Sequence, residues 1–232
     1  MSNEIKKGFS MDFLKTIQII PDNEPTPEEY EQMQEYSRKV DEEYQRQQEI
    51  KYLKSIGIGE RYFEATLERY ICNTPEQTAV LNKVKDFIQN YKKRTLWMIG
   101  NSGTGKTMLA AIICRECHGH YCKSYQIELA LDDCKSFKAA KSKTEVIKEF
   151  SDYPLLVIDE VGKFESKEEI KYLFMIINER YEKNKSTVLI TNKNKKELVE
   201  YLGQPIFDRF TENCMSIEFN FNSYRINKRE EM

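Results

Sequence analysis

The sequence lacks an apolar run of the length that a membrane-spanning helix requires, about 18–20 residues. Its first twenty residues mix charged and apolar side chains, so they lack the uninterrupted apolar centre of a signal peptide. The chain also has no excess of positive charge, since the formal net charge is −2 in 232 residues. These absences predict a cytoplasmic protein that does not contact membranes, and any nucleic-acid contact must come from a local basic patch.

Potential metal ligands are also scarce, because no Cys or His precedes Cys72. The six cysteines are expected to be thiols in a reducing cytosol. Residues 114–122, CRECHGHYC, raise the alternative of zinc, since Cys-x-x-Cys with nearby histidines has ligand-like spacing. A second Cys-x-x-Cys is missing, and the segment also fits a helix that leads into a strand. We favour the second interpretation.

Residues 1–55 differ in composition from the rest of the chain and predict an N-terminal helical arm. Thr26 can cap a helix, Pro27 suits its first position and Glu29 completes a capping box. A long polar helix should follow, ending near Ser55, with too few apolar residues for a core of its own. Two interpretations are open: a solvated, partly disordered segment, or a docking arm. In the second, the residues facing a partner are Tyr30, Met33, Tyr36, Val40 and Tyr44.

Residues 56–232 alternate short apolar segments with helical patterns, which predicts an α/β domain with a five-stranded parallel sheet. The strands are predicted at 96–99, 124–127, 155–158, 187–191 and 216–219. The helices are predicted near 106–118, 128–140, 166–184 and 195–202.

The stretch GNSGTGKT, residues 100–107, has the spacing of a phosphate-binding loop and lies between a strand and a helix. Its glycines allow backbone N–H groups to point at phosphate oxygens, and the helix start adds positive potential. Lys106 should reach the β- and γ-phosphates, and the Thr107 hydroxyl should bind Mg²⁺. The predicted nucleotide-binding residues are Gly100, Asn101, Ser102, Gly103, Thr104, Gly105, Lys106, Thr107 and Met108.

A second element, YPLLVIDEVG at residues 153–162, supplies two carboxylates after a buried strand. Asp159 is expected to hold Mg²⁺, and Glu160 to orient and deprotonate the attacking water. Such a pair is a weak signal alone. It becomes strong beside the phosphate loop, because both lie at strand ends on the ligand-binding edge of an α/β sheet.

Two further residues are predicted to complete the catalytic set. Asn192 follows the strand at 187–191, where its amide could touch the γ-phosphate or position the water, although Asn is also common in ordinary turns. Arg209 lies in a short helical stretch, where it suits γ-phosphate contact in a neighbouring subunit. The alternative for Arg209 is a surface ion pair with Asp208 or Glu212, and the sequence does not decide between them.

From residue 51 to about 227 the chain resembles AAA+ ATPases of the bacterial and phage helicase-loader type, the DnaC/DnaI group, which is close to the IstB transposition ATPases. Beyond the nucleotide motifs, three segments carry this resemblance. They are GIGERYFEATLERY followed by TPEQ, LITNKNKKEL with LGQPIFDRF, and the ending FNFNSYRINK.

The resemblance implies an AAA+ fold with little or no helical lid, ATP and Mg²⁺ as cofactors, and self-assembly into a spiral or ring. It implies that Asn192 is sensor 1, that Arg209 is an arginine finger and that Arg225 contacts the nucleotide as a sensor-2-like arginine. It also implies single-stranded DNA as a partner. The sequence offers Phe137 and Lys138 for that contact, as an aromatic flanked by lysines, and Ser166 in the segment 162–169. A solvated lysine face is the alternative, and Glu168 and Glu169 are unfavourable beside phosphates.

We expect a loader that binds a hexameric replicative helicase through its arm and uses ATP hydrolysis as a release switch. An IstB-like transposition ATPase that assembles on DNA and recruits a transposase would have the same nucleotide site. A non-catalytic nucleotide-binding protein is a third hypothesis, and the presence of Glu160 argues against it.

Overall fold

The computed structural model describes residues 26–136 and 139–224, and it divides the chain into two compact units with a boundary between Tyr52 and Leu53. Each unit is described by itself. Within the described ranges, no helix is long and apolar enough to cross a bilayer.

The first unit is represented by the helix α2, Pro27–Ser55, whose last three residues belong to the second unit. The Glu29 carboxylate accepts hydrogen bonds from the backbone N–H (2.8 Å) and the hydroxyl (2.9 Å) of Thr26, so the predicted start is confirmed. Four of its large apolar side chains are exposed, namely Tyr30, Tyr36 (72%), Val40 and Tyr44 (55%), whereas Leu53 near its end is buried. At 100° per residue, the five predicted docking residues fall within an arc of about 120°.

The second unit contains a five-stranded sheet in which every pairing is parallel, as predicted. The strand order is β2-β3-β4-β1-β5. The strands are β1 Thr95–Gly100, β2 His120–Lys123, β3 Leu155–Asp159, β4 Ser186–Thr191 and β5 Cys214–Phe219. The three central strands β3, β4 and β1 are rich in Leu, Ile and Val and are almost fully buried, as expected for a sheet covered on both faces.

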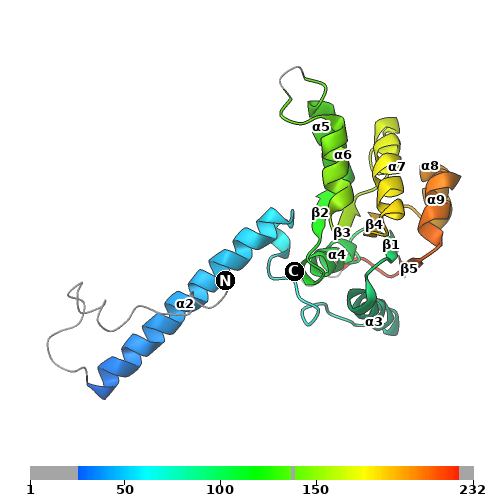
Figure 1. Ribbon diagram of the computed structural model, residues 1–232. Coiled ribbons are helices and arrows are strands. Elements are labelled where there is room, and N and C mark those ends of the chain that lie inside the picture. Colours follow the sequence, from blue (N-terminus) through cyan, green and yellow to red (C-terminus); the bar gives the residue numbers. More distant parts are fainter. Residues whose placement is uncertain (1–25, 137–138, 225–232) are drawn as a thin grey trace. The chain divides into compact units, whose positions relative to one another are not determined.

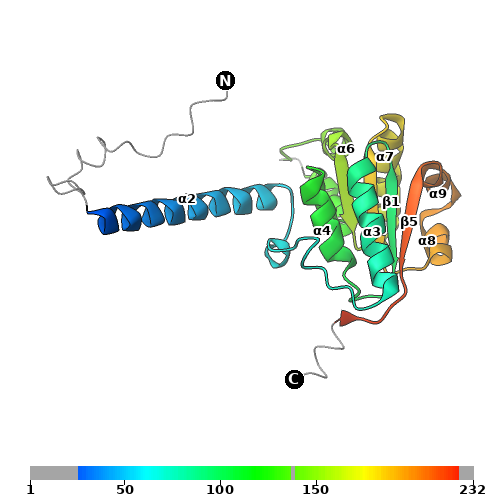
Figure 2. The same ribbon diagram turned by 90° about the horizontal axis from the view of Figure 1, so that it is seen from below.

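Helices cover both faces of this sheet (Figure 1). One face carries α3 Pro75–Asn90 and α4 Lys106–Glu116, which Figure 2 shows in front of the strands. The other face carries α5 to α9, which pack against one another in sequence. Their bounds are α5 Ser124–Asp133, α6 Lys143–Asp152, α7 Lys167–Glu182, α8 Lys195–Leu202 and α9 Gln204–Thr211. All strands end at the same edge, which places the loops that follow β1, β3 and β4 side by side.

The prediction of a strand at 124–127 was wrong. The strand is β2 at 120–123, and residues 124–127 begin α5, where Ile127 and Leu131 are buried one helical turn apart. A short apolar segment does not distinguish a strand from a buried helix by periodicity alone. The predicted helix at 128–140 was also wrong in extent, because α5 ends at Asp133 and Ser142 caps a separate helix, α6.

A buried arginine joins three of these elements on the helical face. Arg180 of α7 is 1% exposed and donates to the carbonyl groups of Phe150 (2.9 Å), Tyr153 (2.9 Å) and Ser186. Its Nε also donates to Thr187 Oγ1 at 2.9 Å. The guanidinium therefore fixes the end of α6 and the start of β4 against α7.

Candidate nucleotide-binding site

The loop from Gly100 to Lys106 connects β1 to α4 and curls through three residues of positive φ. These are Gly100 (+123°), Gly103 (+80°) and Gly105 (+92°), a region that residues with a Cβ rarely adopt. A Cβ at Gly100 would lie 2.6 Å from the carbonyl oxygen of Phe219, so this turn also needs glycine for space. The backbone thus has the shape that exposes consecutive N–H groups at a helix start.

Lys106 lies inside this loop and donates to the carbonyl oxygens of Gly100 (2.7 Å) and Asn101 (2.6 Å). Lys106 is only 5% exposed. Burial lowers the pKa of the Lys106 ammonium to about 8, and the nearby Asp159 carboxylate opposes this shift. An ammonium held only by carbonyl groups suits an anionic ligand such as a triphosphate.

Thr107 and Asp159 meet across the sheet edge, although 52 positions separate them in the sequence. The Thr107 hydroxyl donates to Asp159 Oδ2 at 2.8 Å, and the Tyr121 hydroxyl donates to the same oxygen at 2.7 Å. The backbone N–H of Glu160 donates to Asp159 Oδ1 at 2.6 Å. An oxygen donor set of hydroxyl and carboxylate is what Mg²⁺ prefers, and Tyr121 holds the carboxylate in place. The sequence patterns gave no indication of Tyr121.

Glu160 begins the loop after β3 with a positive φ of +59°, which is uncommon for a residue with a side chain. Its backbone carbonyl accepts from the Ser124 hydroxyl at 3.1 Å. Its carboxylate forms ion pairs with Lys163 (3.1 Å) and Lys123 (3.5 Å). Glu160 lines the same cavity as Lys106 and Thr107. Within it, the carboxylate is held by these two lysine ammonium groups.

A cavity of about 560 Å³ joins these residues. One part is polar and is lined by Lys106, Thr107, Asp159, Glu160 and Asn192. The lining also includes a second, largely apolar and aromatic group, which sequence reasoning missed: Tyr62, Ala65, Tyr70, Ile71, Met108 and Tyr224. Of these, only Met108 was predicted. A polar part beside an aromatic part suits a nucleotide, which has phosphates at one end and a flat base at the other.

Residues before α3 and after β5 close this cavity against the phosphate loop. The Tyr70 hydroxyl donates to the Thr104 carbonyl at 3.4 Å, and a Cβ at Gly105 would lie 2.9 Å from the Tyr70 ring. The backbone N–H of Tyr224 donates to the Gly103 carbonyl at 3.1 Å, and its hydroxyl donates to the Ile71 carbonyl. The segment that resembled the family's lead-in thus forms a wall of the site.

Asn192 lies where the sequence predicted it, directly after β4 and in the cavity lining beside Glu160. The preceding Thr191 donates from its hydroxyl to the Val161 carbonyl at 2.7 Å. Val161 in turn donates its N–H to the Ile190 carbonyl at 3.0 Å. The loops that carry Glu160 and Asn192 are therefore bonded to each other beyond the end of the sheet.

Arg209 does not line this cavity. It lies in α9, donates to the Pro205 carbonyl at 2.8 Å and is 5.5 Å above the Phe174 ring. The residues around it include Thr95, the first residue of β1, and Thr187, the second residue of β4, so Arg209 lies at the opposite edge of the sheet. From there it has no access to the nucleotide site of its own chain.

Of the four remaining predicted site residues, the structure describes one, Ser166. Ser166 is the N-cap of α7: its hydroxyl accepts from the N–H of Glu169 and donates to Glu128 at 2.8 Å. Glu169, which we expected to repel phosphates, is buried at 2% exposure. The positions of Phe137, Lys138 and Arg225 lie outside the described residues.

The three cysteines of the 114–122 segment are buried thiols within the domain. Burial raises the pKa of Cys117 and of Cys122 to about 12, and it also raises that of Cys114. Cys114 and Cys117 lie at the end of α4, and Cys122 lies in β2, so the segment does run from a helix into a strand.

Residues 38–232 match the family described as IstB-like ATP binding protein. The chain belongs to this family. Members are P-loop ATPases, so the chain binds and hydrolyses ATP, and its cavity with Lys106 and Thr107 is the place where the nucleotide motifs meet.

Two kinds of relative share this family's sequence pattern. Over 180 residues the chain is 31% identical to the replicative helicase loader DnaC of Escherichia coli, and the match covers 73% of this chain and 72% of that protein. Over 144 residues it is 33% identical to a Bacillus thuringiensis insertion-sequence protein named as ATP-binding, covering 58% of this chain and 57% of that protein.

Solved structures share the fold. The crystal structure of the DnaC helicase loader is similar with a TM-score of 0.63 and 23% identity, covering 70% of this chain and all of that one. The structure of DnaI is similar with a TM-score of 0.56 and 20% identity, covering 72% and 94% of the two chains. The AAA+ fold predicted from the sequence is therefore confirmed.

Proposed function

We propose that this ATPase loads a hexameric replicative DNA helicase onto single-stranded DNA and that ATP hydrolysis releases it. The observation that carries this proposal is the 31% identity to a replicative helicase loader over 180 residues, which are 73% of this chain and 72% of that protein. Because the match covers far more of the chain than the nucleotide motifs do, it supports a shared function more strongly than those motifs alone.

The residues of the cavity fit ATP and Mg²⁺. Thr107 and Asp159 supply oxygen ligands for the metal, and Lys106 with the loop N–H groups holds the phosphates. Mg²⁺, when bound, neutralises charge on the phosphate oxygens. Glu160 takes a proton from the attacking water, and Asn192 orients that water. The aromatic part, which includes Tyr70 and Tyr224, receives the base.

Arg209 acts in trans in this proposal. Because it lies at the edge opposite its own cavity, it reaches a nucleotide only if a neighbouring subunit presents one there. A head-to-tail contact between subunits repeats and produces a ring or a spiral. Hydrolysis then depends on assembly, which suits a switch that ends the loaded state.

The arm would contact the helicase. Four of its predicted docking residues, Tyr30, Tyr36, Val40 and Tyr44, are exposed and lie within about one third of the circumference of α2, as expected for a helix that docks in a groove. For single-stranded DNA, the loop after β3 offers Phe164, which is 63% exposed, with the Lys163 ammonium 5.5 Å from its ring. An exposed aromatic beside lysines can stack on a base and pair with a phosphate.

The first experiment is a pull-down from the cells in which the protein acts. Glu160→Gln should bind ATP without hydrolysing it and so hold the loading state. With ATP and Mg²⁺ it should retain the replicative helicase, whereas Lys106→Ala, which does not bind ATP, should retain much less. The absence of helicase with Glu160→Gln under these conditions would contradict the proposal.

The docking arm can be tested in the same assay. Tyr36→Ser with Tyr44→Ser should weaken helicase binding by about tenfold or more, since exposed aromatic residues dominate such contacts. The matched control is Gln34→Ser with Gln45→Ser, which introduces the same two residues outside the apolar arc of α2. Equal losses from both pairs would show a general effect on the helix rather than a docking face.

A transposition ATPase that recruits a transposase is the second candidate, and it is favoured by the 33% identity to an insertion-sequence protein over 58% of the chain. Competition between single-stranded and double-stranded oligonucleotides in the presence of ATP separates the two. Preference for duplex DNA, with a transposase in the pull-down, would replace the loader proposal.

A further inference from the structure

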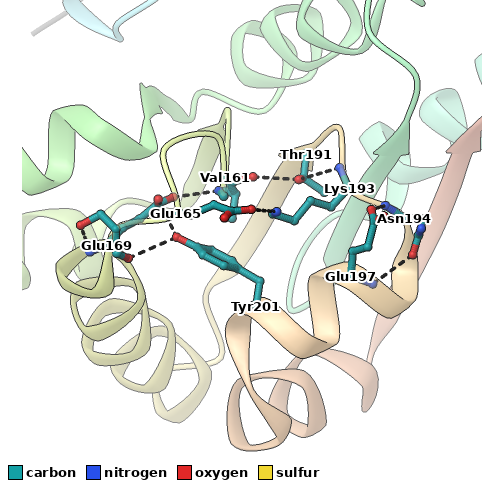
Figure 3. Close-up of polar contacts among 10 residues, drawn as sticks. Val161, Glu165, Glu169, Thr191, Lys193, Asn194, Glu197 and Tyr201 are labelled. Atoms are coloured by element: carbon teal, nitrogen blue, oxygen red, sulfur yellow. Dashed lines mark hydrogen bonds and ion pairs between the residues drawn. The ribbon is translucent and has the colours of Figure 1, made fainter.

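The loops after β3 and β4 are held together by a second set of contacts that the nucleotide motifs do not account for (Figure 3). The first loop carries Glu160 and the second carries Asn192. Three residues of the first loop, Glu160, Gly162 and Glu165, have positive φ angles of +59°, +72° and +52°. A loop with three uncommon φ angles keeps one conformation only if contacts with residues outside the loop hold it there.

The central contact is the buried carboxylate of Glu169 in α7. Its Oε1 accepts from the N–H of Gly162 at 3.0 Å, and its Oε2 accepts from the hydroxyl of Tyr201 at 2.7 Å. The residue is 2% exposed. Because the oxygens of a buried carboxyl group are costly to leave without donors, the position of each donor is tightly determined. Glu169 therefore links the loop after β3 to α8, the helix that follows Asn192.

A second contact joins the loop after β3 to the loop after β4. Lys193, the residue after Asn192, forms an ion pair with Glu165 at 2.6 Å and lies 5.3 Å over the Tyr201 ring. A Cβ at Gly162 would lie 2.6 Å from Lys193 Cε, so the side chain packs directly on the loop backbone. Glu165 is 68% exposed, which makes this ion pair a weak one. Figure 3 shows the Tyr201 hydroxyl pointing at Glu169 and the ion pair that joins Glu165 to Lys193.

We propose that Glu169 and Tyr201 are positioning residues that fix Glu160 relative to Asn192. Both catalytic side chains must meet the same phosphate and water, and a displacement of one loop by a fraction of an ångström would separate them. Neither Glu169 nor Tyr201 lines the nucleotide cavity, so they act through the backbone of the two loops. This inference rests on the roles proposed above for Glu160 and Asn192.

The test is Tyr201→Phe in the full-length protein. This change removes one hydroxyl, breaks the bond to Glu169 and keeps the ring that packs under Lys193. We expect kcat for ATP hydrolysis to fall by about tenfold, while KM and the Kd for a fluorescent ATP analogue change less than about twofold. The matched control is Tyr172→Phe, which removes a hydroxyl bonded to Asp132 at 3.4 Å, away from both loops.

The variant Glu169→Gln tests whether Glu169 is needed for its hydrogen bonds or for its charge. The amide keeps an oxygen for Gly162 and offers an N–H to the Tyr201 oxygen, so it should retain most of the activity. Glu169→Leu should lose as much as Tyr201→Phe or more. Thermal unfolding of each variant shows whether the fold is intact.

The inference is overturned if Tyr201→Phe and Tyr172→Phe have equal kcat, or if kcat and Kd change in parallel with a lowered Tm. Failure of the proposed function would look different. In that case Glu160→Gln would itself leave ATP hydrolysis unchanged, or the helicase would not be retained, whatever the effect of Tyr201→Phe.

Discussion

At the scale of the residue, the nucleotide site depends on a few polar groups whose neighbours set their chemistry. Lys106 is the clearest case, since its ammonium is nearly enclosed and is bonded only to carbonyl oxygens. Burial lowers its pKa from 10.5 to about 8. A phosphate ligand requires the protonated form and so favours it.

This shift predicts a pH dependence of ATP binding. The free protein loses the Lys106 proton as the pH rises through about 8, so the Kd for ATP should increase by up to about tenfold between pH 8 and pH 9. The triphosphate is already fully ionised in this range and contributes nothing to the change. Titration with a fluorescent ATP analogue measures it. Lys106→Met should bind weakly at every pH, and a wild-type Kd that is constant from pH 7 to pH 9.5 would contradict the expectation.

The lowered pKa of Lys106 also affects the stability of the nucleotide-free protein. Stability is expected to increase as the pH rises, whereas ATP binding weakens. In the unfolded chain the Lys106 pKa returns to its ordinary value near 10.5, so the unfolded state binds more protons between pH 8 and 10.5. This group therefore favours unfolding at neutral pH, and its unfavourable contribution decreases as the pH rises through that window. Bound ATP removes the penalty by supplying a charged partner.

At the scale of the element, polar side chains buried between helices and strands determine how the layers lie. Arg180 satisfies carbonyl groups at the end of α6 and the start of β4 while it belongs to α7. Glu169 of α7 accepts hydrogen bonds from Gly162 in the loop after β3 and from Tyr201 in α8, and so links these two segments. Both occur in a helix, α7, whose sequence pattern shows only an amphipathic stripe.

Replacement of Arg180 by Met should destabilise the fold strongly. The apolar chain fills similar space but leaves several buried carbonyl groups without a donor, and we expect a loss of about 3 kcal/mol in the free energy of unfolding. Denaturant unfolding measures this loss. The control is Arg94→Met, which removes a partly exposed ion pair with Asp86 and should cost less than about 1 kcal/mol. Equal losses from the two variants would show that Arg180 is not a structural link.

At the scale of the whole molecule, the residues that we propose for catalysis lie at opposite edges of the sheet. The cavity with Lys106 lies at the strand ends, and Arg209 lies where the strands begin. In the proposed mechanism the arginine of one chain serves the nucleotide of another, so catalysis would require at least two copies.

A mixing experiment tests this arrangement. Arg209→Ala should bind ATP normally and hydrolyse it at least about tenfold more slowly. Lys106→Ala should not bind ATP but should still present Arg209. A mixture of the two should recover hydrolysis, because the arginine of one subunit can serve the nucleotide of the other. No recovery in the mixture, with each variant folded, would contradict the role in trans.

The sequence by itself determined the features that depend on local spacing. The helix start at Thr26, the glycine-rich loop, Asp159 with Glu160 and the five-stranded parallel sheet were all predictable, because each depends on residue types at fixed intervals along the chain. The strand at 120–123 was not. HYCK is short, and the apolar run beside it fits a helix as well as a strand until the packing of Ile127 and Leu131 decides the matter.

Only the tertiary structure decided which distant residues meet. Tyr121 bonds Asp159 across 38 positions, Tyr70 and Tyr224 close the cavity from opposite ends of the domain, and Tyr201 bonds Glu169 across 32 positions. These contacts have no signature in the sequence, because a tyrosine that packs in a core has the same local pattern as one that bonds a buried carboxylate. The physical reason is that hydrogen bonds depend on distances in space, and the crossovers of a parallel sheet set those distances.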